Sequence, residues 1–202
     1  MADSAHLTQK DDGKICDVGK REATIEDLYH VADEDGKAEI VNGELVIMGP
    51  IGDSHGYGSR EIVVSLREYE RATRLGRAIP DNVAFIVNLP NRRSFSPDAA
   101  FHVGGLFGKR FIEGAPVFAV EIRSEGDYGP AAERRLAQKR ADYFAAGTLV
   151  VWDVDILRDE LVRVYRASDP QTATIYRRGE RAEADPAVPE WSMPVDDLFL
   201  PA

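Results

Sequence analysis

The feature that most constrains the fold is a series of short apolar runs that are rich in β-branched and aromatic residues. Each run is bounded by proline, asparagine or glycine, the residues that usually end strands. We therefore predict strands at residues 83–89, 95–103, 117–122, 149–155, 161–165 and 172–176. Strands of this length bury their apolar faces only when they pair in a sheet that other elements cover.

Two amphipathic helices are predicted to cover this sheet. In the first, from about residue 59 to 75, apolar side chains recur at helical spacing and arginines occupy the other face. The second spans residues 130–146, where proline is tolerated in the first turn and Gly147 supplies a left-handed end. The order of these elements predicts a mixed α/β fold, with a central mixed sheet flanked by helices and additional β-hairpins.

The segment before the first of these helices is expected to contain a short helix and a hairpin. Thr24 lies three residues before Asp27, a capping-box-like pattern that predicts a helix at residues 24–31. Two β-rich runs within residues 38–48 surround Asn42-Gly43, which tolerates the positive φ angles of a type I′ turn.

Bulk properties restrict the class of protein. The 202 residues fit one domain, 44% of them are hydrophobic, and no apolar segment is long enough to span a bilayer. Residues 1–22 lack periodicity, so a flexible tail is predicted before a single domain at residues 23–202. The polar N-terminus carries no secretory signal, and a single cysteine, Cys16, fits a reducing compartment. A cytoplasmic location without membrane contact is therefore expected.

The net charge of −10 counts against tight binding of nucleic acid, because phosphate neutralisation needs clustered lysine and arginine. The acidic residues gather toward the two ends of the sequence, however, and arginines and lysines are frequent in the middle. Charge alone favours solvated helix faces over a basic binding face.

Two carboxylates beside apolar strand residues are candidate metal ligands. Asp98 directly follows a proline and precedes an apolar run, and Glu121 interrupts a run that otherwise resembles a buried strand. If the two strands are neighbours, the acids meet at one end of the sheet and can hold a hard divalent cation. Each acid alone would more often lie at an exposed edge or cap a turn, but the pair favours a site.

Lys139 shares one face of the second helix with Arg135 and Tyr143, because the three follow one another at four-residue spacing. If this face is directed toward the acids, the lysine can stabilise charge that develops on a phosphate or orient the attacking water. Without such a context, a solvated lysine on a surface helix is the more common case.

An ordered set of short motifs resembles a known family. The motifs are Asn42-Gly43-Glu44-Leu45, His55 before a helix, Ser96-Pro97-Asp98, Val120-Glu121-Ile122-Arg123-Ser124, the segment from Lys139 to Gly147, and Val150-Val151-Trp152-Asp153-Val154-Asp155. In this order they resemble the Uma-two family, bacterial proteins described as restriction endonucleases within the PD-(D/E)XK nuclease superfamily. The resemblance covers about residues 24–200, and its specificity lies in the order of the motifs.

The resemblance implies a restriction-endonuclease-like fold in which Asp98 and Glu121 are catalytic acids that bind metal, and Glu44 is a further catalytic acid that either binds the metal or orients Lys139. In the superfamily a lysine often lies two residues after the second acid, but Arg123 occupies that position here and is a poor substitute. The family places the lysine on the following helix instead, at the position of Lys139.

Further candidates on the substrate side are His55, Arg123 and Tyr143. His55 is expected in a glycine-rich loop at residues 49–58, where hydrogen bonding at a helix start is weighed above a role in the site. Residues 49–53 and 125–127 depart from the family pattern, which puts the substrate loops in question and leaves the acids intact.

Two functions stay open at this point. The first is an endonuclease that hydrolyses DNA phosphodiester bonds with Mg²⁺ or Mn²⁺ and assembles as a homo-oligomer, expected to be a dimer. The second is a catalytically inactive nuclease-fold protein with a binding or regulatory role, which the acidic net charge and the altered loops suggest. A sugar-cleaving pair of acids would need aromatic platforms, and Trp152 lies in an apolar run typical of a core.

Overall fold

A six-stranded mixed sheet forms the centre of the computed structural model, which describes residues 8–10, 13–16, 21–34, 36–105 and 108–201. Among these residues the strand order is β13-β12-β11-β10-β8-β5. Neighbouring strands are antiparallel except for β10 and β11, which run parallel. The strands are β5 (Arg77–Pro80), β8 (Ala99–His102), β10 (Phe118–Ile122), β11 (Val150–Asp155), β12 (Leu161–Arg166) and β13 (Asp169–Arg177). The predicted central mixed sheet is confirmed.

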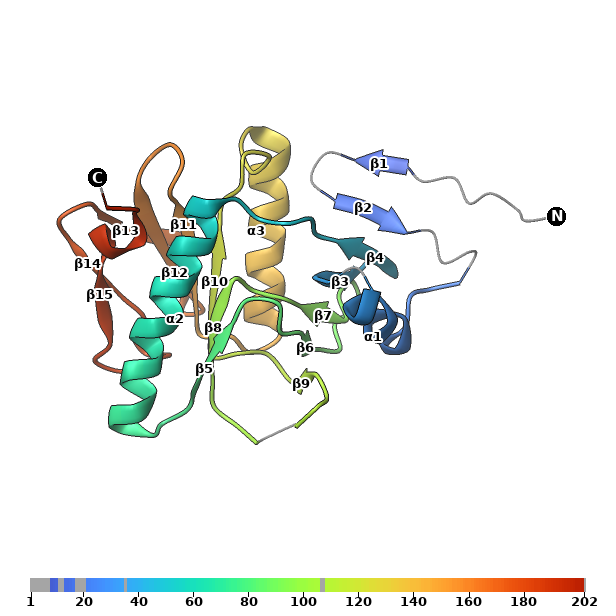
Figure 1. Cartoon of the computed structure of the whole chain (residues 1–202), viewed down its shortest axis with the longest axis horizontal. Helices are drawn as coiled ribbons and strands as arrows, with labels where there is room; N and C mark the ends of the chain where they lie inside the picture. The colour runs from blue at the N-terminus through green and yellow to red at the C-terminus, as the bar shows by residue number, and fades with distance from the viewer. Residues whose placement is uncertain (1–7, 11–12, 17–20, 35, 106–107, 202) are drawn as a thin grey trace.

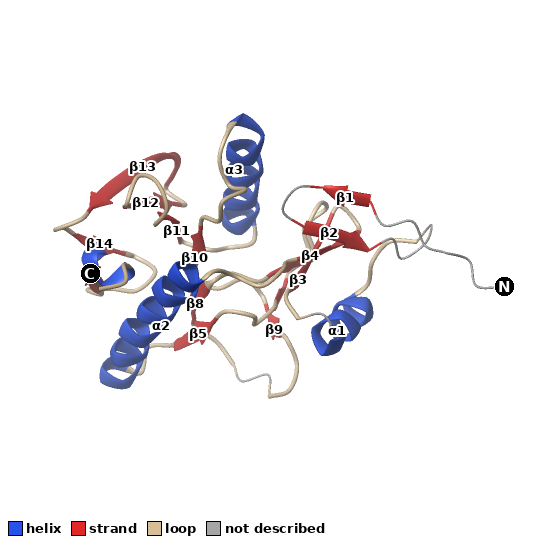
Figure 2. Cartoon of the chain, turned by 45° about the horizontal axis from the view of Figure 1, so that its top comes forward, coloured by secondary structure: helices blue, strands red, loops and turns tan. Residues whose placement is uncertain are grey.

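The two long helices cover opposite faces of this sheet, as Figure 2 shows. Helix α2 (Asp53–Thr73) packs Ile62 and Leu66 into a core that contains Trp152, whereas α3 (Pro130–Ala145) packs Tyr143 into a core that contains Val151. Val151 and Trp152 are adjacent in β11, so they point to opposite faces of the sheet. Trp152 is completely buried, as expected for a core residue.

A second sheet, of order β1-β2-β4-β3, lies at one end of the molecule beside α1 (Ile25–Glu34) (Figure 1). Its hairpin joins β3 (Ala38–Val41) to β4 (Glu44–Ile47) through Asn42 and Gly43, whose φ angles of 51° and 76° match the predicted turn. Thr24 and Asp27 exchange the predicted capping hydrogen bonds at the start of α1.

The N-terminal strands β1 (Thr8–Lys10) and β2 (Gly13–Cys16) were not predicted, since they lie in the segment expected to be a tail. β2 forms because it pairs with β4, and its own sequence has no apolar pattern that predicts a strand. The rest of that segment, residues 1–7, 11–12 and 17–20, lies outside the described residues, and the flexible tail stays a prediction.

The remaining elements are short. They are β6 (Phe85–Ile86), β7 (Ser94–Phe95), β9 (Ile112–Glu113), β14 (Arg181–Glu183), β15 (Ser192–Pro194) and the 3₁₀ helix η1 (Val195–Leu198). Their strands form a three-stranded sheet of order β7-β6-β9 and a two-stranded sheet of β14 and β15. No helix in the described part of the chain is both long and apolar enough to cross a membrane.

Helix α2 begins at Asp53, six residues earlier than predicted, so His55 lies in its first turn and not in a loop. The prediction of a loop rested on the glycines at 56 and 58, which disfavour a helix by about 1 kcal/mol each. Packing explains Gly58: a β-carbon there would lie 3.3 Å from the carbonyl oxygen of Leu198. The close approach of the C-terminal segment therefore favours a small residue at a position that local preference assigns to a loop.

Candidate functional site

Asp98 and Glu121 lie close together at one end of the central sheet, where the charge of Asp98 acts on Glu121. β8 and β10 are antiparallel with Ala99 paired to Val120, and Asp98 directly precedes β8 and donates its backbone N–H to the carbonyl oxygen of Val120, the residue before Glu121. The backbone N–H of Ile122 donates a hydrogen bond of 2.7 Å to Oδ2 of Asp98, which fixes the carboxylate against β10. The structure thus brings together the two acids that the sequence singled out.

Helix α3 directs Lys139 and Tyr143 toward Glu121. Nζ of Lys139 lies 2.8 Å from Oε2 of Glu121, and the Tyr143 hydroxyl donates a hydrogen bond of 2.7 Å to Oε1. Both donors lie on one helix face because they are four residues apart. Each oxygen of Glu121 therefore has its own donor, and the predicted helix face does look toward the acids.

A third acid at this site is Glu39 of β3, which the sequence analysis did not select. Its Oε1 lies 2.9 Å from Nζ of Lys139 and accepts a 2.9 Å hydrogen bond from the backbone N–H of Ser96. Its Oε2 lies 2.6 Å from Nη1 of Arg92. A signal for Glu39 was available, since it interrupts an apolar strand run in the same way as Glu121.

Glu44, the hairpin acid selected from the sequence, is exposed and is not brought to this cluster by any described contact. In the β3–β4 register Glu39 pairs with Val46 and Val41 pairs with Glu44, so the two glutamates share one face of the hairpin. Glu44 lies nearer the turn, and the buried position beside Lys139 belongs to Glu39. A catalytic or metal-binding role for Glu44 remains a prediction.

Two further side chains contact Asp98. Nζ of Lys37, in the segment before β3, lies 2.6 Å from Oδ1 of Asp98 and 2.7 Å from Oδ1 of Asp81. Nε2 of His55 lies 3.2 Å from Oδ2 of Asp98, which gives this predicted residue a place at the site. Nothing in the local pattern of the sequence identifies Lys37, because it becomes part of the site only through a contact between residues 61 positions apart in the chain.

Burial and neighbouring charge give the acids of this cluster different proton affinities. For Glu121, burial raises the pKa to about 7: Lys139 lowers it, but repulsion by Asp98 and Glu39 adds to the effect of burial. For Glu39, burial also opposes ionisation, but Lys139 and Arg92 lower the pKa to about 2. Glu121 is therefore the acid of this pair that exchanges its proton near neutral pH.

The other groups at the site keep their charges. Burial raises the pKa of Asp98, but contact with His55 and Lys37 outweighs it and holds the pKa well below its ordinary value. Burial lowers the pKa of Lys139, yet the carboxylates of Glu121 and Glu39 raise it above its ordinary value. Lys139 is accordingly a stable positive charge and not a proton acceptor at neutral pH.

Comparison with known proteins shows the family and the fold of this chain. The Uma2 family, described as "Putative restriction endonuclease", matches residues 24–196. The chain belongs to the Uma2 family. No curated protein matches the sequence. Among solved structures, a putative nuclease from Anabaena variabilis is similar, with a TM-score of 0.68 and 19% sequence identity over 88% of this chain and 97% of that one. This likeness supports the restriction-endonuclease-like fold.

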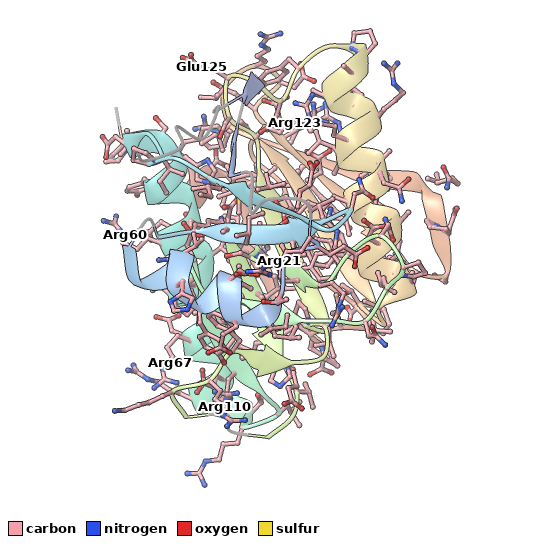
Figure 3. The ribbon with its side chains drawn as sticks, turned by 90° about the vertical axis from the view of Figure 1, so that its right-hand side faces the viewer. Arg21, Arg60, Arg67, Arg110, Arg123 and Glu125 are labelled. Atoms are coloured by element: carbon pink, nitrogen blue, oxygen red, sulfur yellow. The ribbon has the colours of Figure 1, made fainter. Side chains whose placement is uncertain are left out.

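In this Uma2 chain, Arg123 does not serve as the lysine of the superfamily pattern. Its guanidinium group binds Asp153 through two hydrogen bonds of 2.6 and 2.8 Å and also contacts Glu133 of α3. Arg123 is only 4% exposed, and Figure 3 shows it beside one end of α3. These contacts tie β10, β11 and α3 together, so the geometry supports a structural role and not the predicted position on the substrate side.

The residues of the site fit a small divalent cation only in part. Within the described segments, no group of three or more histidine, cysteine, aspartate or glutamate side chains is arranged to hold a metal ion, so the predicted ligands Asp98, Glu121 and Glu44 do not form such a group. Mg²⁺ usually takes only one or two protein carboxylates and keeps several waters. The neighbouring carboxylates of Asp98 and Glu121 suit that requirement, and burial together with repulsion by the nearby acids keeps the pKa of Glu121 raised even with Lys139 beside it.

Proposed function

We propose that this Uma2 protein is a nuclease that hydrolyses DNA phosphodiester bonds with Mg²⁺ or Mn²⁺ held by Asp98 and Glu121. One observation carries the proposal: Asp98, bonded to the backbone of β10 on either side of Glu121, lies beside that acid, and Lys139 is bound to Glu121. Two acids can hold a divalent ion, and an adjacent ammonium group can stabilise the negative charge that develops during phosphate hydrolysis. The family description points to the same chemistry.

The side chains around the acids have separate tasks in this proposal. Lys139 stays protonated, so it acts through its charge and stabilises the phosphate as negative charge builds up on it. Tyr143 holds the other oxygen of Glu121 and fixes the direction of the carboxylate. A bound divalent ion supplies Lewis-acid stabilisation of the reacting phosphate.

The test is cleavage of end-labelled single- and double-stranded DNA, and of RNA of the same sequence, with Mg²⁺, Mn²⁺ or EDTA. Replacing Asp98 by asparagine keeps the size of the side chain and removes the charge. We expect at least about a hundredfold loss of metal-dependent DNA cleavage, because a metal ligand is lost. Asp169→Asn is the matched control, since it removes an exposed carboxylate at the start of β13.

Cleavage by Asp98→Asn at the rate of the unchanged protein would refute the assigned site. Cleavage in EDTA at the same rate as with Mg²⁺ or Mn²⁺ would refute the metal requirement. Cleavage of RNA but not of DNA would show that the substrate is RNA. The homodimer and the cytoplasmic location remain predictions, and sedimentation of the purified protein tests the first of them.

A second candidate function is a nuclease-fold binding protein without turnover. It is favoured by one observation: each acid of the pair already has a lysine partner, Lys37 for Asp98 and Lys139 for Glu121. In such a protein the charges would serve the structure alone. Titration with Mn²⁺ separates the two candidates, because a purely structural network releases no heat on addition of metal.

A further inference from the structure

Lys37 occupies the side of Asp98 that a metal ion would use. Oδ2 of Asp98 already accepts the backbone N–H of Ile122 and lies 3.2 Å from His55. Oδ1 is the remaining oxygen, and Nζ of Lys37 lies 2.6 Å from it. The side chain of Lys37 is 12% exposed and that of Asp98 6%, so this is a shielded ion pair and not a surface contact.

Lys37 also has a second partner that can hold it when it leaves Asp98. Its ammonium group lies 2.7 Å from Oδ1 of Asp81, whose side chain is 25% exposed and therefore closer to solvent. A lysine bound to two acids can give up one of them without becoming an unpaired buried charge. Lys139 differs, because both of its partners, Glu39 and Glu121, belong to the buried cluster.

We infer that Lys37 is the built-in counter-ion of Asp98, which competes with the divalent cation for Oδ1 and is retained by Asp81 when the cation binds. This inference rests on the proposed function, because it assumes that Asp98 is a metal ligand. Lys37 is then a residue that positions Asp98 in the metal-free protein and sets the metal concentration at which the site fills. Two positive ions cannot share one carboxylate oxygen without strong repulsion at this distance.

The inference is tested by direct binding of Mn²⁺ to the full-length protein, measured by calorimetry and by the electron paramagnetic resonance signal of free Mn²⁺. Lys37→Met removes the competing charge and keeps the length of the side chain. We expect it to bind Mn²⁺ at least about tenfold more tightly than the unchanged protein, since the repulsion between an ammonium group and a divalent ion is lost.

Two variants control for charge and folding. Lys109→Met removes an exposed lysine and changes the net charge by the same amount, so it is expected to leave Mn²⁺ binding unchanged. The double variant Lys37→Met with Asp81→Asn preserves the net charge of the chain. It also removes the carboxylate at position 81, which would otherwise lose its lysine partner. It is expected to fold at least as well as Lys37→Met and to bind Mn²⁺ equally tightly.

The outcomes separate this inference from the proposed function. Tighter binding by both Lys37 variants, with Lys109→Met unchanged, supports the competition. Equal or weaker binding by the Lys37 variants overturns it, while loss of binding in Asp98→Asn would still leave the proposed metal site standing. Absence of Mn²⁺ binding in the unchanged protein and in every variant refutes the metal site and this inference together.

Discussion

The raised pKa of Glu121 predicts a specific dependence of stability on pH. Between pH 4.5 and about 7 the unfolded chain releases the proton of this carboxyl group, whereas the folded protein keeps it. The folded state then binds more protons than the unfolded state, so the free energy of unfolding falls as pH rises through this window. Glu121→Gln removes the titrating group and should remove this loss of stability.

The size of the effect follows from the change in proton affinity. Raising the pKa from 4.5 to about 7 corresponds to about 3 kcal/mol, because a tenfold change in affinity is worth about 1.4 kcal/mol. The stability of Glu121→Gln, relative to the unchanged protein, should therefore rise by up to about 3 kcal/mol between pH 4.5 and pH 8. Any constant loss from weaker contacts with Lys139 or Tyr143 cancels in this comparison across pH.

The assay is urea denaturation followed by tryptophan fluorescence at several pH values, with EDTA present so that no metal binds to the acids. Glu133→Gln is the matched control: hydrogen bonding to Arg123 lowers the pKa of Glu133, so its contribution changes only below pH 4.5. Its stability relative to the unchanged protein should stay level from pH 5 to pH 8. If the free energy of unfolding of Glu121→Gln, relative to the unchanged protein, does not change with pH over the same range, the raised proton affinity of Glu121 is refuted.

Two substitutions of buried arginines give further predictions. Arg92→Met should lower the free energy of unfolding by about 3–5 kcal/mol, because it removes the guanidinium group that pairs with the buried carboxylates of both Glu39 and Asp142, and the contacts that remain compensate for that charge only in part. Urea denaturation measures this, and a loss below about 1 kcal/mol would contradict the ion-pair assignment. Arg123→Lys restores the lysine of the superfamily pattern but breaks the bidentate hydrogen bonds to Asp153. The melting temperature should therefore fall, and DNA cleavage should not increase. Faster cleavage would show that this position, and not the lysine on α3, serves the reaction.

Local patterns in the sequence were sufficient for much of the fold. The Asn42-Gly43 hairpin, the end of α3 before Gly147 and the strands β10 and β11 follow from turn residues and apolar runs, because these signals act over a few neighbouring residues. The same reasoning failed at β5, at β2 and at the start of α2. In each case pairing or packing with a distant segment overrides a weak local preference.

The sequence by itself selected Asp98, Glu121 and Lys139, because acids within apolar strands and a lysine on a periodic helix are visible without coordinates. It also selected Glu44, through the family resemblance, and missed Glu39, although the two share one face of the same hairpin. Only the tertiary structure shows which of the two contacts Lys139. Ile40 of β3 accepts a hydrogen bond from the backbone N–H of Arg93 and donates one to the Ser94 hydroxyl, and in this position Glu39, not Glu44, contacts Lys139. Contacts between segments far apart in the chain carry no local signature, and for this reason Lys37 and Glu39 emerge as members of the site only from the folded protein.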